Sequence, residues 1–98
     1  MKELIISRVC DRFGTSLEEI ESVSRRHRIA DARAAICYLM SRYSRMTLDE
    51  IGNAVRSDYG HSNVIHMIKK ARNLIDTEPA FRDAIAECES SFGDPVKY

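Results

Sequence analysis

The sequence predicts an all-α fold of five or six helices, and three observations favour it. Apolar residues recur with a period close to 3.6 along most of the chain, the spacing of helices that bury one face. Only four glycines and two prolines interrupt the 98 residues, which argues against a loop-rich or all-β fold. The composition, 44% hydrophobic and 31% charged, is that of a globular protein with one core. We therefore expect a single helical domain over residues 1–91 and a frayed tail over residues 92–98.

Two short helices are predicted before residue 24, and each has a recognisable boundary. The buried face of the first is formed by residues at i, i+3, i+4 and i+7, namely Ile6, Val9, Cys10 and Phe13. Gly14 is a natural stop just beyond that face. Ser16 and Glu19 form a capping box, in which each side chain satisfies a backbone amide at the start of the second helix. The residues that this second helix is expected to bury are Leu17, Ile20 and Val23.

The longest predicted helix covers residues 28–43 and follows a basic link at residues 24–28. Its apolar residues form a stripe about 100° wide, made up of Ile29, Ala32, Ile36, Leu39, Met40 and Tyr43. A stripe of that width is typical of a central core helix. Arg33 lies at the flank of the stripe, where a charge needs a partner or a route to solvent.

Two further helices, joined by a turn at residues 56–60, form a helix-turn-helix pattern over about residues 47–75. Thr47 can cap the first of them. The residues expected to be buried in it are Leu48, Ile51 and Val55. The second begins near His61, and its expected core residues are Val64, Ile65, Ile68, Ala71 and Ile75. Thr77 is expected to cap a sixth helix, whose inward residues are Phe81, Ile85 and Cys88.

The sequence offers no catalytic, nucleotide or metal site, so we expect a non-enzymatic protein without a cofactor. Its serine, histidine and aspartate residues lie in no nucleophile-elbow pattern. None of the four glycines begins the Gly-x-x-x-x-Gly-Lys-[Ser/Thr] pattern that holds ATP phosphates. The three cysteines are far apart and lack Cys-x-x-Cys spacing, which indicates free thiols. His61 and His66 would lie about 140° apart on one helix, a poor arrangement for a metal pair.

The formal net charge of zero conceals an uneven distribution along the chain. Residues 24–72 carry ten basic and four acidic groups, a net charge of +6, whereas residues 1–23 carry −2 and residues 73–98 carry −4. A basic middle between acidic ends fits a protein with one surface that faces an anion. The chain shows no apolar run long enough for a membrane span or a signal peptide, so we expect a cytoplasmic protein.

Two groups of residues in the helix-turn-helix region and its basic link are candidates for DNA contact. The first turn of the later helix offers groups that can reach base edges in a major groove: His61, Ser62 and Asn63. The link offers guanidinium groups that suit phosphates and a minor groove: Arg25, Arg26 and Arg28. A helix-turn-helix pattern by itself is weakly specific, since many small helical proteins contain such a corner.

Residues 47–75 resemble the C-terminal DNA-binding domain of the bacterial replication initiator family DnaA. The family has an Ile-Gly helix, a short turn, then a histidine, small hydroxyl residues, two aliphatic residues and a second histidine. Here these stand as Thr-Leu-Asp-Glu-Ile-Gly-Asn-Ala-Val and Gly-His-Ser-Asn-Val-Ile-His-Met-Ile-Lys-Lys. Upstream, Ser24-Arg25…Ile29…Ala32-Arg33 resembles the family's basic loop and central helix. The resemblance covers roughly residues 5–75 and implies a Trp-repressor-like helix-turn-helix fold at the bacterial nucleoid.

The resemblance implies sequence-specific binding of double-stranded DNA by a monomer that regulates replication or transcription at DnaA-box-like sites. Arg25 would enter a minor groove, and Arg33 would read a guanine in the major groove. The other expected base contacts are His61, Ser62 and Asn63. The expected phosphate contacts are Arg26, Arg28, Leu48, His66, Lys69 and Lys70.

Five positions depart from the family's pattern: Asp31, Ala34, Gly60, Ser62 and Asn63. Asn63 replaces a threonine whose methyl group would pack on thymine, and asparagine prefers an adenine edge. Duplex binding is expected to survive these changes, while the base preference is expected to shift.

Alternative interpretations remain open for several of these residues. The arginines of the link can form a solvated basic loop, and Lys69 and Lys70 can be ordinary cations near a helix C-terminus. Arg33 can form an ion pair with Asp49 or Glu50. The whole fold can also serve as a protein–protein interaction module, which the acidic segment 73–98 favours.

Overall fold

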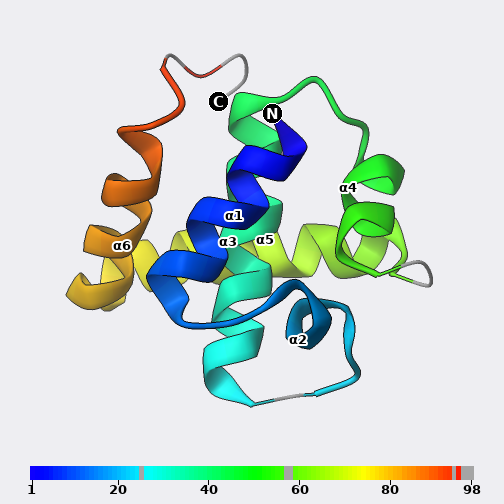
Figure 1. Ribbon diagram of the computed structural model, residues 1–98, viewed down its shortest axis with the longest axis horizontal. Helices are drawn as coiled ribbons and strands as arrows, with labels where there is room; N and C mark the ends of the chain where they lie inside the picture. Colours follow the sequence, from blue (N-terminus) through cyan, green and yellow to red (C-terminus); the bar gives the residue numbers. More distant parts are fainter. Residues whose placement is uncertain (25, 57–58, 94, 96–98) are drawn as a thin grey trace.

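Six helices make up the part of the chain that the computed structural model describes, residues 1–24, 26–56, 59–93 and 95, and this part contains no strand. They are α1 (Lys2–Phe13), α2 (Leu17–Glu21), α3 (His27–Tyr43), α4 (Leu48–Val55), α5 (His61–Thr77) and α6 (Pro79–Glu89). The prediction of an all-α fold is confirmed. Figure 1 shows α3 passing through the middle of the molecule, with α4 and α6 on opposite sides of it. Within the described ranges, no helix is long and apolar enough to span a lipid bilayer.

Helix α3 is the centre of the core. Every residue from Ala32 to Met40 is buried, and the helix packs against α1, α2, α4 and α5. The whole predicted stripe is buried, and the burial extends around the helix beyond it. Small side chains outside the stripe, such as Ala34 and Ala35, let neighbouring helices approach closely on those faces. The central helix therefore fixes the positions of the elements on both sides of it.

The end of α1 and the starts of α2 and α4 follow the capping signals in the sequence. Gly14 ends α1 in the left-handed conformation, with a φ of 67°, that glycine adopts without steric cost. The Ser16 hydroxyl accepts a hydrogen bond from the amide of Glu19, whose carboxylate accepts one from the amide of Ser16. Thr47 and Glu50 make the same reciprocal pair at the start of α4. These local bonds determine where α2 and α4 begin.

Several residues predicted to be buried lie at the surface instead. The exposed fractions of Leu17, Val23, Leu48 and Ile65 are 47%, 80%, 36% and 39%. Helix α2 has only five residues and buries Ile20 alone, and Val23 lies beyond its end. Leu48 is the first residue of α4, and Ile65 lies one turn after the start of α5. The helical period alone overestimated the width of these buried faces.

The C-terminal part also differs from the prediction. Thr77 is the last residue of α5 rather than a cap, and its hydroxyl donates to the carbonyl of Asn73 at 2.9 Å. Helix α6 instead begins with Pro79 in its first turn. Phe92 is buried rather than frayed, because its ring packs on Tyr43 with the ring centroids 5.3 Å apart.

Candidate nucleic-acid interface

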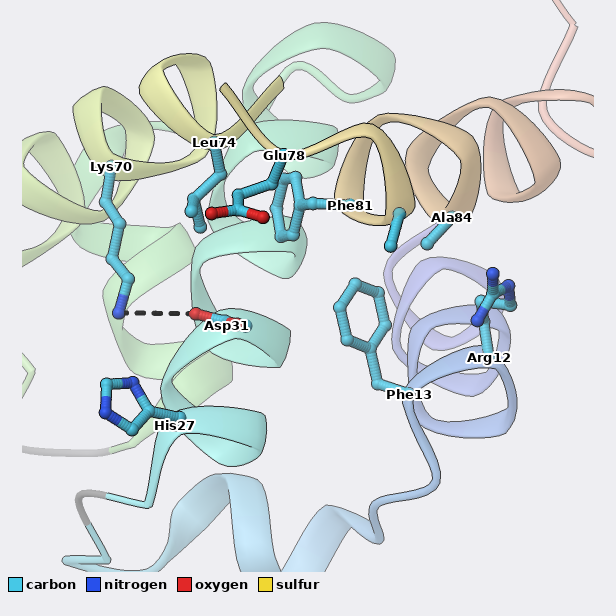
Figure 2. A pocket seen from close by; sticks show the side chains of 10 residues that line it. Arg12, Phe13, His27, Asp31, Lys70, Leu74, Glu78, Phe81 and Ala84 are labelled. Carbon is cyan, nitrogen blue, oxygen red and sulfur yellow. Dashed lines mark ion pairs between the residues drawn. The ribbon is translucent and has the colours of Figure 1, made fainter. Parts of the chain in front are cut away.

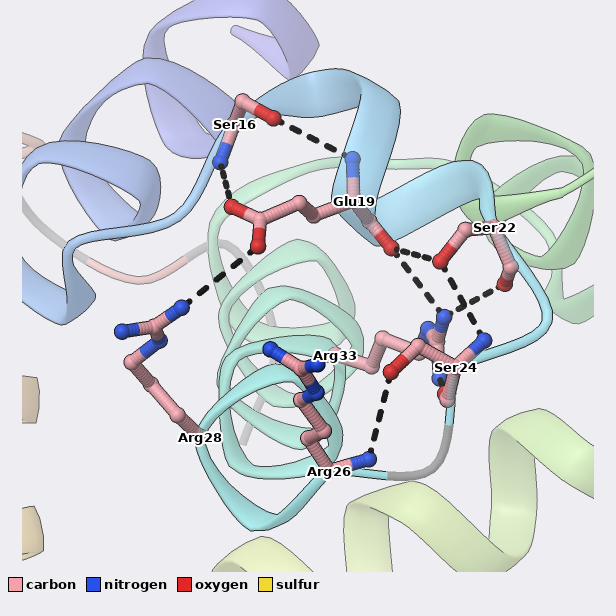
Figure 3. A network of polar contacts seen from close by, with 7 residues as sticks. All are labelled: Ser16, Glu19, Ser22, Ser24, Arg26, Arg28 and Arg33. Carbon is pink, nitrogen blue, oxygen red and sulfur yellow. Dashed lines mark hydrogen bonds and ion pairs between the residues drawn. The ribbon is translucent and has the colours of Figure 1, made fainter.

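The loop between α2 and α3, of which residues 22–24 and 26 are described, is bound at Ser22 and Ser24 by one buried side chain of α3 (Figure 3). Arg33 donates hydrogen bonds to four backbone carbonyls: those of Ile20 at 2.9 Å, Ser24 at 2.5 Å, Ser22 at 2.5 Å and Glu19 at 3.2 Å. Carbonyl dipoles thus replace the water that the guanidinium loses on burial. Arg33 connects the central helix to the open end of α2 and to the loop.

Arg33 does not occupy the position expected of a base-reading residue. It is 7% exposed, and burial lowers the pKa of its guanidinium, with Tyr59 acting in the opposite direction. To read a guanine, it would have to exchange four carbonyl bonds for two base acceptors. Nor does Arg33 pair with Asp49 or Glu50, because its bonds within the described part of the chain go to the carbonyls.

Arg56 binds the same loop, and sequence reasoning missed it. It is the C-cap residue of α4, at the start of the helix-turn-helix turn, and its Nη1 donates to the carbonyl of Ser22 at 3.2 Å. Its guanidinium also lies 5.6 Å from the ring centroid of Tyr59. The carbonyl of Ser22 therefore accepts hydrogen bonds from α3 and from the end of α4. In the sequence, Arg56 stands out only as a charged residue in a turn. That signal does not indicate that its partner is the carbonyl of Ser22.

The first turn of α5 presents polar side chains to solvent, as the sequence predicts. His61, Ser62 and Asn63 are exposed. The N-cap residue, Gly60, contributes no side-chain hydrogen bond to this turn. His61 Nδ1 lies 3.3 Å from Asp49 Oδ1, which brings the starts of α4 and α5 together. The geometry is that of a recognition helix whose N-terminal end faces outward.

A polar cavity of about 600 Å³ lies between the loop and α5. Its walls come from the loop, α3, the α4–α5 turn and α5: Val23, Ser24, Ala30, Arg33, Arg56, Tyr59, Asn63, His66 and Met67. Three predicted site residues, Arg33, Asn63 and His66, are thereby brought to one concavity. The loop stands on one side of it and α5 on the other.

All of the expected phosphate contacts except Lys70 are exposed side chains. Arg26, His66 and Lys69 are exposed, and so is Arg28, whose Nη2 lies 3.4 Å from Glu19 Oε2. Lys70 is half-buried and pairs with Asp31, with 3.5 Å between Nζ and Oδ1 (Figure 2). The geometry thus favours Lys69 over Lys70 as a phosphate contact. Arg25 lies outside the described residues.

A second cavity, of about 620 Å³, lies among α1, α3, α5 and α6 (Figure 2). Phe13, Leu74 and Phe81 form its apolar part, while its charged residues, which include Arg12 and Glu78, are of both signs. Mixed charge gives an anionic polymer no preferred surface here. In the described ranges no three His, Cys, Asp or Glu side chains are grouped as metal ligands.

Comparison with known proteins assigns the chain to one family. Residues 2–71 match the family model described as the bacterial dnaA protein helix-turn-helix. The chromosomal replication initiator protein DnaA of Gloeobacter violaceus is 37% identical over 69% of this chain, and that of Flavobacterium psychrophilum is 31% identical over 76%. The same protein of Lachnoclostridium phytofermentans is 34% identical over 85% of the chain. These alignments cover 15%, 15% and 18% of the three relatives, so the chain spans less than a fifth of their length.

Proposed function

The chain belongs to the bacterial dnaA protein helix-turn-helix family, a family of DNA-binding domains, and we propose that it binds double-stranded DNA sequence-specifically at DnaA-box-like sites. It would act there as a monomeric regulator of replication or transcription, without ATPase activity. The observation that carries the proposal is the placement of the basic loop and the exposed first turn of α5 on either side of one polar concavity. In a DNA duplex the minor and major grooves lie side by side, so the loop can enter the minor groove while the first turn of α5 enters the major groove.

Base reading is assigned to the exposed polar start of α5. His61, Ser62 and Asn63 project from the end of a helix whose other face is anchored by the buried Val64 and Ile68. Side chains on such a supported first turn reach base edges when the helix enters a major groove. Arg25 of the basic loop is proposed to enter the adjacent minor groove. Arg33 is not included among the base readers, because its guanidinium is engaged by carbonyls.

Phosphate binding is assigned to cations on both sides of the concavity. Arg26, Arg28 and Lys69 are exposed and long enough to follow a phosphate backbone. Leu48 and His66 are proposed as neighbouring contacts, Leu48 through the start of α4, where backbone amides favour an anion. Lys70 could contribute only after leaving Asp31.

The proposal is tested by fluorescence anisotropy with two labelled duplexes, one containing a DnaA box and one with the same bases scrambled, across a salt series. The three exposed cations assigned to phosphate, Arg26, Arg28 and Lys69, predict a log–log slope of about −3. The expected result is steep salt dependence on both duplexes and tighter binding of the box.

The outcomes separate the proposal from the second candidate, a protein–protein interaction module. Equal, salt-sensitive binding of both duplexes would retain DNA binding and contradict the proposed box preference. No binding to either duplex at low salt would contradict DNA binding altogether. The acidic segment 73–98, with two basic and six acidic groups, would then favour a protein partner.

A further inference from the structure

Two arginines that lie 23 positions apart in the sequence meet at the carbonyl oxygen of Ser22. Arg33 reaches it from the central helix at 2.5 Å, and Arg56 reaches it from the C-terminal end of α4 at 3.2 Å. Ser22 ends α2 and opens the basic loop. One backbone atom of the loop is therefore bonded both to the core and to the helix-turn-helix.

The loop has further internal order that continues from this point. The Ser22 hydroxyl accepts from the amide of Ser24 at 3.2 Å, and the Ser24 hydroxyl accepts from the amide of Arg26 at 3.3 Å (Figure 3). Arg33 holds the Ser24 carbonyl as well, at 2.5 Å. The amides of Ser24 and Arg26 are therefore bonded to hydroxyls of Ser22 and Ser24, the residues whose carbonyls the two arginines hold.

Arginine suits this task because its planar guanidinium can bind several carbonyls from fixed directions at once. Four of the five N–H groups of Arg33 are donated to this end of α2 and the loop. Without them, the four carbonyls would lose the bonds from Arg33, the Ser22 carbonyl would still be held by Arg56, and the loop would no longer have one preferred position.

We propose that Arg33 and Arg56 are positioning residues for DNA binding: they hold the basic loop at a fixed distance from α5, so that the loop and the recognition helix engage a duplex as one rigid unit. This inference rests on the proposed function. The two arginines contribute to affinity through the loop's cations and not through a base of their own. Replacing Arg33 or Arg56 is therefore expected to remove the gain in DNA affinity that the arginines of the loop provide.

The test is a double-mutant cycle by anisotropy, combining Arg33→Met with the loop variant Arg25→Ala/Arg26→Ala. In the wild-type background, the loop variant is expected to weaken binding on the order of tenfold, and in the Arg33→Met background by much less. Arg56→Met is expected to give the same non-additivity. Additive losses, or relaxed discrimination at a single base pair in Arg33→Met, would overturn the proposal, because these are the signatures of a base-reading residue.

Arg42→Met is the matched control for loss of a partly buried arginine. Arg42 binds Tyr38 and Glu89, away from the loop, and its replacement is expected to leave the loop's contribution to affinity unchanged. Circular dichroism establishes that each variant is folded. If Arg33→Met does not fold, Arg56→Met and Arg33→Lys complete the cycle.

A second readout needs no DNA and keeps the inference distinguishable from the proposed function. Amide hydrogen exchange at Ser24 and Arg26 is expected to accelerate in Arg33→Met and Arg56→Met but not in Arg42→Met. Unchanged exchange in the first two would contradict the positioning role even if the wild-type protein binds DNA tightly. Accelerated exchange in a protein that binds no duplex would refute the proposed function alone.

Discussion

Gly52 of α4 lies directly against the backbone of Tyr59. A Cβ atom at position 52 would stand 2.2 Å from the Tyr59 carbonyl oxygen and 3.3 Å from a methyl group of Val64. This contact lets Tyr59 lie against α4, and the start of α5 lies beside the start of α4, where His61 meets Asp49. The glycine of the Ile-Gly pair in the helix-turn-helix is therefore required for steric reasons.

Replacing Gly52 by alanine is expected to destabilise the protein by about 1–3 kcal/mol, since the backbone of Tyr59 must move. Thermal unfolding followed by circular dichroism measures the change. Gly60→Ser is the matched control, because a Cβ at Gly60 meets no atom within 4 Å and serine is a good N-cap residue. Its expected change is a few tenths of a kcal/mol. A Gly52→Ala protein as stable as wild type would contradict the tight corner.

Helix α6 is held to α3 by a carboxylate with two partners. Glu89 Oε2 accepts from Arg42 Nη1 at 3.0 Å and from the Tyr43 hydroxyl at 2.9 Å. Burial, with a contribution from Glu89, raises the pKa of Tyr43 to about 12, so its hydroxyl remains a donor at neutral pH. Glu89→Ala is expected to cost about 1–3 kcal/mol in urea unfolding, because the Tyr43 hydroxyl loses this acceptor and Arg42 retains Tyr38 but loses the carboxylate.

The control for Glu89 is Glu87→Ala. Glu87 pairs with Arg12 at the surface, where both side chains are largely exposed, and such pairs contribute little. If Glu87→Ala lowers the free energy of unfolding as much as Glu89→Ala does, the hydrogen bonds of Glu89 contribute no more to stability than a surface ion pair. Both variants are expected to bind DNA like wild type.

The cysteines are expected to differ in reactivity. Burial raises the pKa of the Cys37 thiol to about 12 and also raises that of Cys88, whereas Cys10 is half-buried in the last turn of α1. Since the thiolate is the reactive form, a thiol reagent at pH 8 should modify Cys10 first, with the other two reacting as the protein unfolds. Raising the pH to 9 should still leave Cys37 protonated. Rapid modification of Cys37 in the native protein would contradict its burial.

Lys69 is expected to contact phosphate without reading sequence. Lys69→Ala should weaken binding to box and scrambled duplexes by the same factor and reduce the magnitude of the salt slope by about 0.9. Arg82→Ala is the matched control, since Arg82 is an exposed cation on α6, away from the proposed interface. If the Lys69 variant loses affinity for the box alone, the assignment to phosphate is wrong.

Local signals in the sequence were sufficient for most of the fold. Both capping boxes and the C-cap at Gly14 depend on residues a few positions apart, so the sequence contains the whole interaction. The edges of the buried helix faces were predicted less well. Leu17 and Ile65 follow the helical period, but their burial depends on whether another helix covers them, and none covers them enough.

The candidate site was predictable in its exposed part and not in its buried part. His61, Ser62 and Asn63 are exposed at the start of a helix, as the pattern and the family resemblance imply. The role of Arg33 depends on carbonyl groups 9 to 14 positions upstream, and backbone acceptors leave no mark in a sequence. Arg56 was missed for the same reason, since its partner is the carbonyl of Ser22.

The most direct test of the proposed interface is a map of the DNA-binding surface by amide chemical shifts, recorded as a DnaA-box duplex is added to the labelled protein. The large changes are expected in the basic loop, the start of α4 and the first two turns of α5. The outer face of α6 and the start of α1 should remain unchanged. Changes centred on α6 and the acidic C-terminal segment, with the start of α5 unaffected, would contradict DNA binding through the helix-turn-helix.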